Sequence, residues 1–272
     1  MAILDVLKEV VLTCGELVIS LRGGNLEAVN KDEQLGQHFS TAADRESLKK
    51  GLLILNQAIP GEVIIAEEKV NNDKIPPDCT VFDPLDGTTN FFNRLDDFGV
   101  TACTLRDAQP IYSATYFPVR KMLILAERGK GCWISTPDHF IPMPVKIHWH
   151  GMMDKTQIGM DVGSWTHKQR VFDSVLRPLS QRFNMLSSMA AVEGGRRVLL
   201  GQTGAYYNLG IARIWDAAAM ALAIQEAGGI VCDPHGSPLQ WKTIGCDWVF
   251  AVNQEIADVI LQYTRQWSGG SS

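Results

Sequence analysis

The sequence predicts a protein of mixed helices and strands, α+β in its first half and α/β in its second half. In the first half, residues 98–134 contain short apolar runs separated by Gly, Pro, Asp and Arg, which is typical of antiparallel strands. In the second half, residues 157–266 alternate strand-like and helix-like segments, which is typical of an α/β arrangement. Apolar residues at helical spacing over residues 3–21 add a helix in front of both parts.

Two amphipathic helices are expected before the first sheet. Apolar residues recur every three or four positions from residue 3 to residue 21, and Gly23-Gly24 ends this pattern. A second helix is expected to begin near Thr41 and to end at Pro60-Gly61. The polar residues between them, 25–38, are predicted to form a loop or a hairpin.

The remaining elements are expected in two parts, divided at the proline-containing segment 136–145. The first part, 1–142, is expected to contain an antiparallel sheet with strands at 63–66, 80–82, 99–105, 111–117, 122–126 and 132–134. The second part, 143–266, is expected to contain strands at 157–160, 185–187, 205–209, 230–232 and 248–252, and helices at 167–180, 190–200, 217–227 and 254–266. The Gly/Ser-rich residues 267–272 are predicted to form a flexible tail.

Composition and charge exclude several classes of protein. Of the 272 residues, 46% are hydrophobic and 20% are charged, which is ordinary globular usage and excludes a disordered chain. The net charge of −5 argues against binding to a nucleic acid polymer, because such proteins are usually basic. The longest stretch without Asp, Glu, Lys or Arg, residues 198–212, is too short to cross a membrane as a helix. Six cysteines without a Cys-x-x-Cys pair, and an N-terminus unlike a secretory signal, predict a cytoplasmic protein with reduced thiols.

The most informative segment is the loop Asp83-Pro84-Leu85-Asp86-Gly87-Thr88-Thr89-Asn90, which follows a predicted strand. Its two carboxylates lie three residues apart, and the threonines can begin a helix whose first N–H groups are free. Hard oxygen ligands beside free N–H groups are the arrangement that a metal–phosphate site needs. The alternative is a capped turn with solvated aspartates, and the acidic spacing does not match an EF-hand.

Other acidic positions are ambiguous when each is taken alone. Glu67 and Glu68 come at the end of a predicted strand and could be solvated in a loop. Asp216 begins an apolar helix, where capping the helix is an alternative role. Asp44 is spaced from Thr41 as in a capping box, and that role is compatible with catalysis because a cap needs one carboxylate oxygen.

In combination and in this order, Glu67-Glu68, the loop 83–91 and Trp215-Asp216 resemble the two motif regions of the inositol monophosphatase family. The resemblance extends from the first helix to about residue 262. It implies an αβαβα layered sandwich of the sugar phosphatase type. It also implies a Mg²⁺-dependent, lithium-sensitive phosphomonoesterase that acts on a small phosphorylated substrate, and a homodimer.

The resemblance further implies roles for individual residues. Two or three Mg²⁺ ions would be bound by Glu67, Asp83, the carbonyl of Leu85, Asp86 and Asp216. The catalytic set would be Asp44, Thr88 and Glu67, with Asp44 and Thr88 orienting and deprotonating the attacking water. The substrate would be bound by Gly87, Thr88, Asn208 and Asp216, the first two through N–H groups directed at the phosphate. Such a set suits Mg²⁺, which prefers oxygen ligands, and two ions about 3.5–4 Å apart can bind both the attacking and the leaving oxygen.

Departures from the family pattern leave the substrate open. Asn208 stands where better-known members have a glutamate that contacts substrate hydroxyls. The segment 187–213 contains Glu193-Gly194-Gly195, which could interrupt a helix or enlarge a pocket. Its arginines could meet a second anionic group or form a solvated basic face; they are Arg196, Arg197 and Arg213. Histidinol-phosphatase, 3'(2'),5'-bisphosphate nucleotidase and fructose-1,6-bisphosphatase activities are therefore alternatives, and a catalytically weak binding relative is another.

Overall fold

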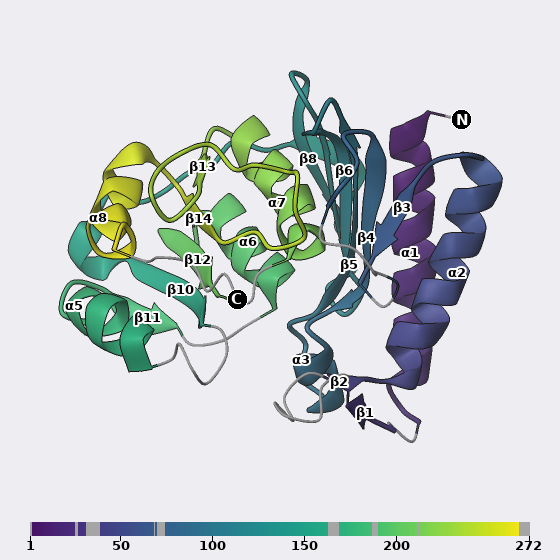
Figure 1. Ribbon diagram of the computed structural model, residues 1–272, viewed down its shortest axis with the longest axis horizontal. Coiled ribbons are helices and arrows are strands. Elements are labelled where there is room, and N and C mark those ends of the chain that lie inside the picture. Colours follow the sequence, from purple (N-terminus) through teal and green to yellow (C-terminus); the bar gives the residue numbers. More distant parts are fainter. Residues whose placement is uncertain are drawn as a thin grey trace.

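The computed structural model describes residues 2–24, 27–30, 39–67, 69, 74–162, 169–186, 190–210 and 213–266. These residues form alternating layers in the order helix, sheet, helix, sheet, helix (Figure 1). The αβαβα layered sandwich is thus confirmed. The layers matter for function because the segments that carry the acidic motif residues meet between the first sheet and the middle helices.

The first helical layer consists of α1 (Ile3–Leu21) and α2 (Ala42–Ala58), which lie side by side on one face of the first sheet (Figure 1). Their apolar stripes pack against that sheet and form a core in which Val10 and Leu55 join Phe82 and Tyr116. Two short strands, β1 (Val29–Asn30) and β2 (Phe39–Ser40), pair with each other in the connection between α1 and α2, just before the first turn of α2. Residues 25–26 and 31–38 of the expected loop or hairpin lie outside the described residues.

The first sheet has seven strands in sequence order, and all pairs are antiparallel except the first. They are β3 (Ile64–Ala66), β4 (Cys79–Asp86), β5 (Gly99–Arg106), β6 (Gln109–Phe117), β7 (Met122–Glu127), β8 (Gly131–Thr136) and β9 (His139–Pro144). The parallel pair β3 and β4 brings the end of both strands, with Glu67 and Asp83, to the same edge of the sheet. A short helix, α3 (Thr88–Phe92), follows β4.

The middle helices, α6 (Ala191–Leu199) and α7 (Ile214–Glu226), lie between the two sheets (Figure 1). The second sheet has the order β11-β10-β12-β14-β13. Its strands are β10 (Gln157–Val162), β11 (Asn184–Leu186), β12 (Ala205–Leu209), β13 (Ile230–Cys232) and β14 (Trp248–Ala251). The outer layer contains α5 (Arg177–Ser180) and α8 (Gln254–Thr264), and a short 3-10 helix (Met153–Lys155) precedes β10.

Some local predictions differ from the structure. The segment 136–145, expected to be the boundary between the two parts and given no strand, contains β9, an exposed edge strand that pairs with β8. Prolines are tolerated there because the outer side of an edge strand needs no N–H donor. The helix expected at 167–180 contains a π-helical stretch, Phe172–Leu176, before α5, and residues 167–168 lie outside the described part.

The middle helices also begin and continue differently from the expectation. Gly194 and Gly195 do not interrupt α6, which runs unbroken through both. A Cβ atom on Gly194 would lie 2.5 Å from the ring of Tyr206, so a glycine lets α6 approach the second sheet closely. Helix α7 begins at Ile214 with Arg213 as its N-cap, so Asp216 is the third helical residue and not the N-cap.

All six cysteines are buried and unpaired, as expected for reduced thiols. Within the described ranges, no helix is both long enough and apolar enough to cross a membrane. Three more segments lie outside the described residues. Two of them, 187–189 and 211–212, belong to the segment 187–213 that departs from the family pattern, here called the unusual region, and the third is the predicted tail 267–272.

Candidate metal centre

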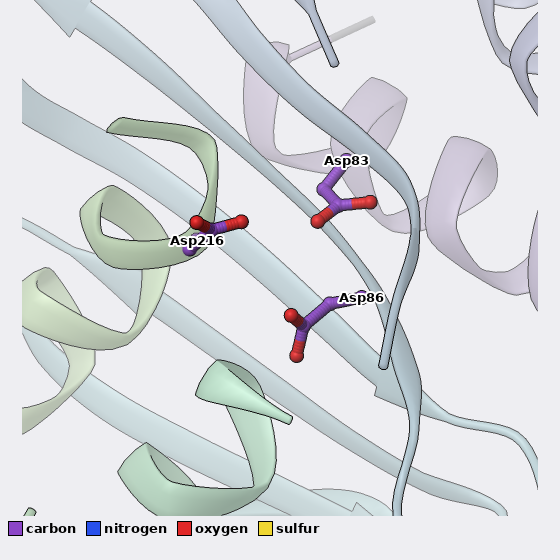
Figure 2. A group of neighbouring side chains, drawn as sticks. All are labelled: Asp83, Asp86 and Asp216. Carbon is purple, nitrogen blue, oxygen red and sulfur yellow. The ribbon is translucent and has the colours of Figure 1, made fainter. Parts of the chain in front are cut away.

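Three carboxylates from two distant parts of the chain converge at the end of strand β4 in the first sheet. Asp83 and Asp86 come from β4, and Asp216 comes from the first turn of α7. One oxygen of each lies within 4.8 Å of the others, and Figure 2 shows the three side chains directed into one shared space. The structure therefore brings together three of the five predicted metal ligands as a single group.

An irregularity in β4 makes this convergence possible. Asp83 pairs with Thr101 and Asp86 pairs with Gly99, so β4 advances three residues where β5 advances two. In a regular strand, residues three apart point to opposite faces, whereas one extra residue returns the second side chain to the first face. The segment around Pro84, which lacks an N–H donor, thus places both aspartates on the side that faces α7.

Each carboxylate in the group is oriented by a backbone donor. The N–H of Leu85 donates to Asp83 Oδ1 at 2.9 Å, and the N–H of Arg213 donates to Asp216 Oδ2 at 3.0 Å. The N–H of Val192, in the first turn of α6, donates to Asp86 Oδ2 at 2.8 Å. Asp83 Oδ2 is buried and accepts no hydrogen bond from any described residue, which leaves one oxygen of this carboxylate available to a ligand.

Burial and mutual repulsion make the three carboxylates unusually basic. Burial first, and then the charges of Glu67, Asp86 and Asp216, raise the pKa of Asp83 well above its ordinary range. Burial and the charges of Asp86 and Glu67 act in the same direction on the pKa of Asp216. For Asp86, burial is again the largest cause, and its pKa is about 7. Such a group gains stability from protons or from a cation, and its oxygen-only donor set fits a hard divalent ion.

Two other predicted ligands border this group. Glu67, in the turn after β3, is outside the trio, but its negative charge contributes to the raised pKa values of Asp83, Asp86 and Asp216. Leu85 is buried, and its carbonyl oxygen lies 3.2 Å from the hydroxyl of Thr88. The charge of Glu67 thus acts on all three aspartates, and the role of Glu67 and Leu85 as further metal ligands stays a prediction.

Asp44 and Thr88 form a direct hydrogen bond beside this group. The Thr88 hydroxyl donates to Asp44 Oδ1 at 2.7 Å. The other oxygen, Oδ2, accepts from the N–H and the hydroxyl of Thr41 at 2.7 and 2.6 Å and completes the capping box of α2. Burial, opposed by these hydrogen bonds, raises the pKa of Asp44. The capping role and the contact with Thr88 therefore coexist, one oxygen serving each.

Gly87 forms the turn between β4 and α3. Its φ of 88° is in the left-handed region that favours glycine. A Cβ atom there would lie 2.7 Å from the Ala190 side chain and 3.0 Å from the Asp97 carbonyl oxygen. The glycine thus allows the turn after β4 to touch both the start of α6 and the loop that precedes β5.

Asn208 lies in β12 of the second sheet. Its side chain is 2% exposed, and no described residue donates to its Oδ1 atom. Its partners across the sheet are Asp161 of β10 and Trp248 of β14. The predicted contact with substrate hydroxyls therefore involves a residue that is buried in this structure.

Two arginines of the unusual region have a different environment from the solvated one that the sequence suggested. Arg196 and Arg197 do not form a solvated basic face, because both bind the fully buried carboxylate of Glu193. Arg213, in contrast, is exposed at the start of α7. Sequence reasoning also missed the Val192 N–H donor to Asp86, since a backbone donor leaves no signal in residue type.

The chain is similar to known proteins along most of its length. The model of the inositol monophosphatase family matches residues 2–267. The Inositol-1-monophosphatase of Synechocystis is 28% identical over an alignment of 274 residues with gaps, which covers 97% of this chain and 90% of that protein. The Nus factor SuhB of Xylella fastidiosa is 28% identical over 221 residues, which cover 78% of this chain and 77% of that protein.

Solved structures show the same fold. The extragenic suppressor protein SuhB from Bartonella henselae superposes with a TM-score of 0.83 at 21% identity, covering 98% of this chain and 99% of that chain. An IMPase/NADP phosphatase solved with NADP and Ca²⁺ superposes with a TM-score of 0.75 at 20% identity, covering 95% of this chain and 93% of that chain. With its family model matched along nearly the whole sequence, the chain belongs to the inositol monophosphatase family and so to that superfamily of phosphatases.

Proposed function

We propose that this protein is a Mg²⁺-dependent phosphomonoesterase that hydrolyses a small phosphorylated alcohol with a metal-activated water. The observation that carries the proposal is the convergence of Asp83, Asp86 and Asp216 beside the hydrogen-bonded pair of Asp44 and Thr88. The NADP- and Ca²⁺-bound relative supports a divalent ion and a phosphorylated ligand in a protein of this fold.

The three aspartates, with Glu67 and the Leu85 carbonyl, would bind two or three Mg²⁺ ions. The buried Asp83 Oδ2 atom and the raised pKa values of the trio support this assignment. Bound Mg²⁺ would neutralise phosphate charge and lower the pKa of a water molecule, which is the main chemical need of phosphoryl transfer.

Asp44 and Thr88 would orient the attacking water and accept its proton. Because Thr88 donates to Asp44 Oδ1, its hydroxyl oxygen keeps lone pairs that can accept a hydrogen bond from water. As the water loses its proton to Thr88 Oγ1, the Thr88 proton can pass to Asp44. The raised pKa of Asp44, caused mainly by burial, favours this transfer.

The substrate phosphate would be bound by the N–H groups of Gly87 and Thr88, at the turn that begins α3. The alcohol part would reach Asp216 and Asn208, and Asn208 would offer an amide where the family pattern has a carboxylate. An uncharged side chain there leaves the alcohol part of the substrate open among inositol phosphate and the alternatives considered above.

A substrate panel tests the proposal. Phosphate release would be measured with inositol phosphate, histidinol phosphate, fructose bisphosphate, adenosine bisphosphate and NADP, each with and without Mg²⁺. Mg²⁺-dependent release from at least one compound, inhibited by lithium, is the expected result. Tight Mg²⁺ binding with no release across the panel would instead indicate a catalytically weak binding protein.

The homodimer implied by the resemblance and the cytoplasmic location predicted from the cysteines and the N-terminus belong to the same proposal. Light scattering of the purified protein at several concentrations would give the mass of the particle, and a monomer at all concentrations would remove the dimer from the proposal.

A further inference from the structure

A buried ionic network lies beside the metal-binding loop and uses the residues that make the 187–213 region unusual. The Glu193 carboxylate, 0% exposed, accepts from Arg196 Nε and Nη2, each at 2.7 Å, and from Arg197 Nε at 2.8 Å. Burial alone would raise the pKa of Glu193, but these arginines and Arg120 hold it below its ordinary value, so the carboxylate stays charged. The network is buried at Glu193 and Arg196 and part-exposed elsewhere, so removing a partner of Glu193 would leave a buried charge less well compensated.

Arg197 extends this network from α6 to the loop before β5. Its Nη2 atom donates to Asp97 Oδ2 at 3.2 Å, while its Nε atom remains on Glu193. Arg120, from the turn between β6 and β7, forms an ion pair with Asp97 and lies 3.6 Å from Glu193 Oε1. Asp97 and Glu193 are therefore joined by two separate arginines.

Both ends of the network contact the parts that shape the metal site. At one end, α6 donates the Val192 N–H to Asp86 Oδ2. At the other end, the Asp97 carbonyl accepts from the Asn90 side chain at 2.7 Å and lies against the Gly87 turn. The network thus connects α6, whose Val192 N–H orients Asp86, to the loop before β5, which lies against the Gly87 turn.

We propose that Glu193, Arg197 and Asp97 are positioning residues, which set the place of Asp86 and of the Gly87–Thr88 turn and thereby the affinity for Mg²⁺. The inference rests on the proposed function, because it assumes that Asp86 is a metal ligand. Residues that orient metal ligands typically contribute about 10–100-fold to metal affinity. None of the three needs to touch the ion or the substrate.

Arg197→Gln is the informative variant. It breaks the Arg197 link to Asp97 and leaves the Arg120 link, while Arg196 still holds the buried Glu193 carboxylate, so we expect the protein to fold. Arg106→Gln is the matched control, since Arg106 forms a two-fold hydrogen-bonded ion pair with Glu62 at 2.8 and 2.9 Å and is similarly part-exposed. That pair lies beside Thr80, six residues before Asp86 and about 20 Å away along the strand.

Titration calorimetry with MgCl₂ alone, together with thermal unfolding, tests the inference without any substrate. We expect Arg197→Gln to bind Mg²⁺ about tenfold more weakly, and Arg106→Gln to bind it as the wild type does although both lower the Tm. Asp97→Asn removes the charge that both Arg197 and Arg120 bind, so it should weaken binding at least as much, and the double variant should lose no more than Asp97→Asn alone. Saturating Mg²⁺ should restore most of kcat in Arg197→Gln.

The possible contrary results separate this inference from the proposed function. Wild-type affinity in Arg197→Gln, an equal loss in Arg106→Gln, or simple addition in the double variant would overturn the positioning role alone. Failure of the wild-type protein to bind Mg²⁺ would overturn the proposed function and this inference with it.

Discussion

Thr88 donates its hydroxyl hydrogen to Asp44 Oδ1 at 2.7 Å, joining α2 to the turn after β4 across 44 residues of sequence. The second oxygen of Asp44 is fully used by Thr41, so the carboxylate is held on both sides. A fixed carboxylate with a raised pKa beside a hydroxyl is suited to accept a proton during water attack.

Thr88→Val replaces the hydroxyl by a methyl group of similar size. We expect kcat to fall by about 10²–10⁴-fold, the usual contribution of a positioned proton acceptor, with little change in Mg²⁺ affinity. Thr88→Ser keeps the hydroxyl and should retain most of the activity. Steady-state kinetics on the best substrate of the panel would measure both variants. A Thr88→Val protein with normal kcat would assign the proton transfer to another group.

Thr41→Ala and Asp44→Asn separate the capping role from the catalytic one. Thr41→Ala removes the side-chain cap of α2 and should lower the free energy of unfolding by about 1 kcal/mol while activity persists. Asp44→Asn removes the charge that Thr88 contacts and should abolish most of kcat. Denaturant unfolding and kcat, measured on both, distinguish the roles. Equal losses of activity in the two variants would mean that Asp44 acts through the helix cap alone.

Much of this arrangement was predictable because it depends on local patterns. The helical spacing of residues 3–21 predicted α1, and short apolar runs predicted most strands of the first sheet. The motif segments around Asp83 and Asp216 predicted the family, which the family model confirms. These signals can be recognised in the sequence because each depends only on residue type and spacing within one segment.

What could not be predicted depends on contacts between distant segments. The bulge that turns Asp83 and Asp86 to one face is set by pairing with β5, and the donor to Asp86 is a backbone N–H of α6. The pair Gly194-Gly195 looks like a helix breaker until the ring of Tyr206 is placed against it. In each case the tertiary partner, and not the local propensity, decides the conformation.

Metal-free stability should depend on pH through Asp86. Burial, with the charge of Glu67, raises its pKa from 3.8 to about 7, so the folded protein keeps a proton that the unfolded chain releases. Its stabilising contribution is therefore full below about pH 4 and is lost as the pH rises to about 7. In EDTA, Asp86→Asn should become more stable relative to the wild type over this range. Denaturant unfolding from pH 5 to 8 measures the difference, and parallel curves for the two proteins would contradict it.

The same variant should lose metal-dependent function while keeping the fold. Asp86→Asn removes one charge from the trio, so we expect weak Mg²⁺ binding and near-complete loss of phosphate release. In the wild type, Mg²⁺ affinity should be higher at pH 8 than at pH 6, because the ion displaces the proton of Asp86, whose pKa is about 7. Calorimetry at pH 6 and pH 8 would measure this, with circular dichroism as the check on folding.

Gly194→Ala tests whether α6 depends on close packing against the second sheet. The added Cβ would lie 2.5–2.6 Å from three ring atoms of Tyr206, whose side chain is fully buried, so the helix must shift. Overpacking of this kind costs about 1–3 kcal/mol, more than the helix gains from replacing glycine by alanine. Since α6 carries the Val192 N–H that orients Asp86, Mg²⁺ affinity should fall together with the Tm. Gly23→Ala is the control, because a Cβ there meets no described atom within 4 Å. A Gly194→Ala protein with unchanged Tm and unchanged Mg²⁺ affinity would show that α6 can move without disturbing the metal site.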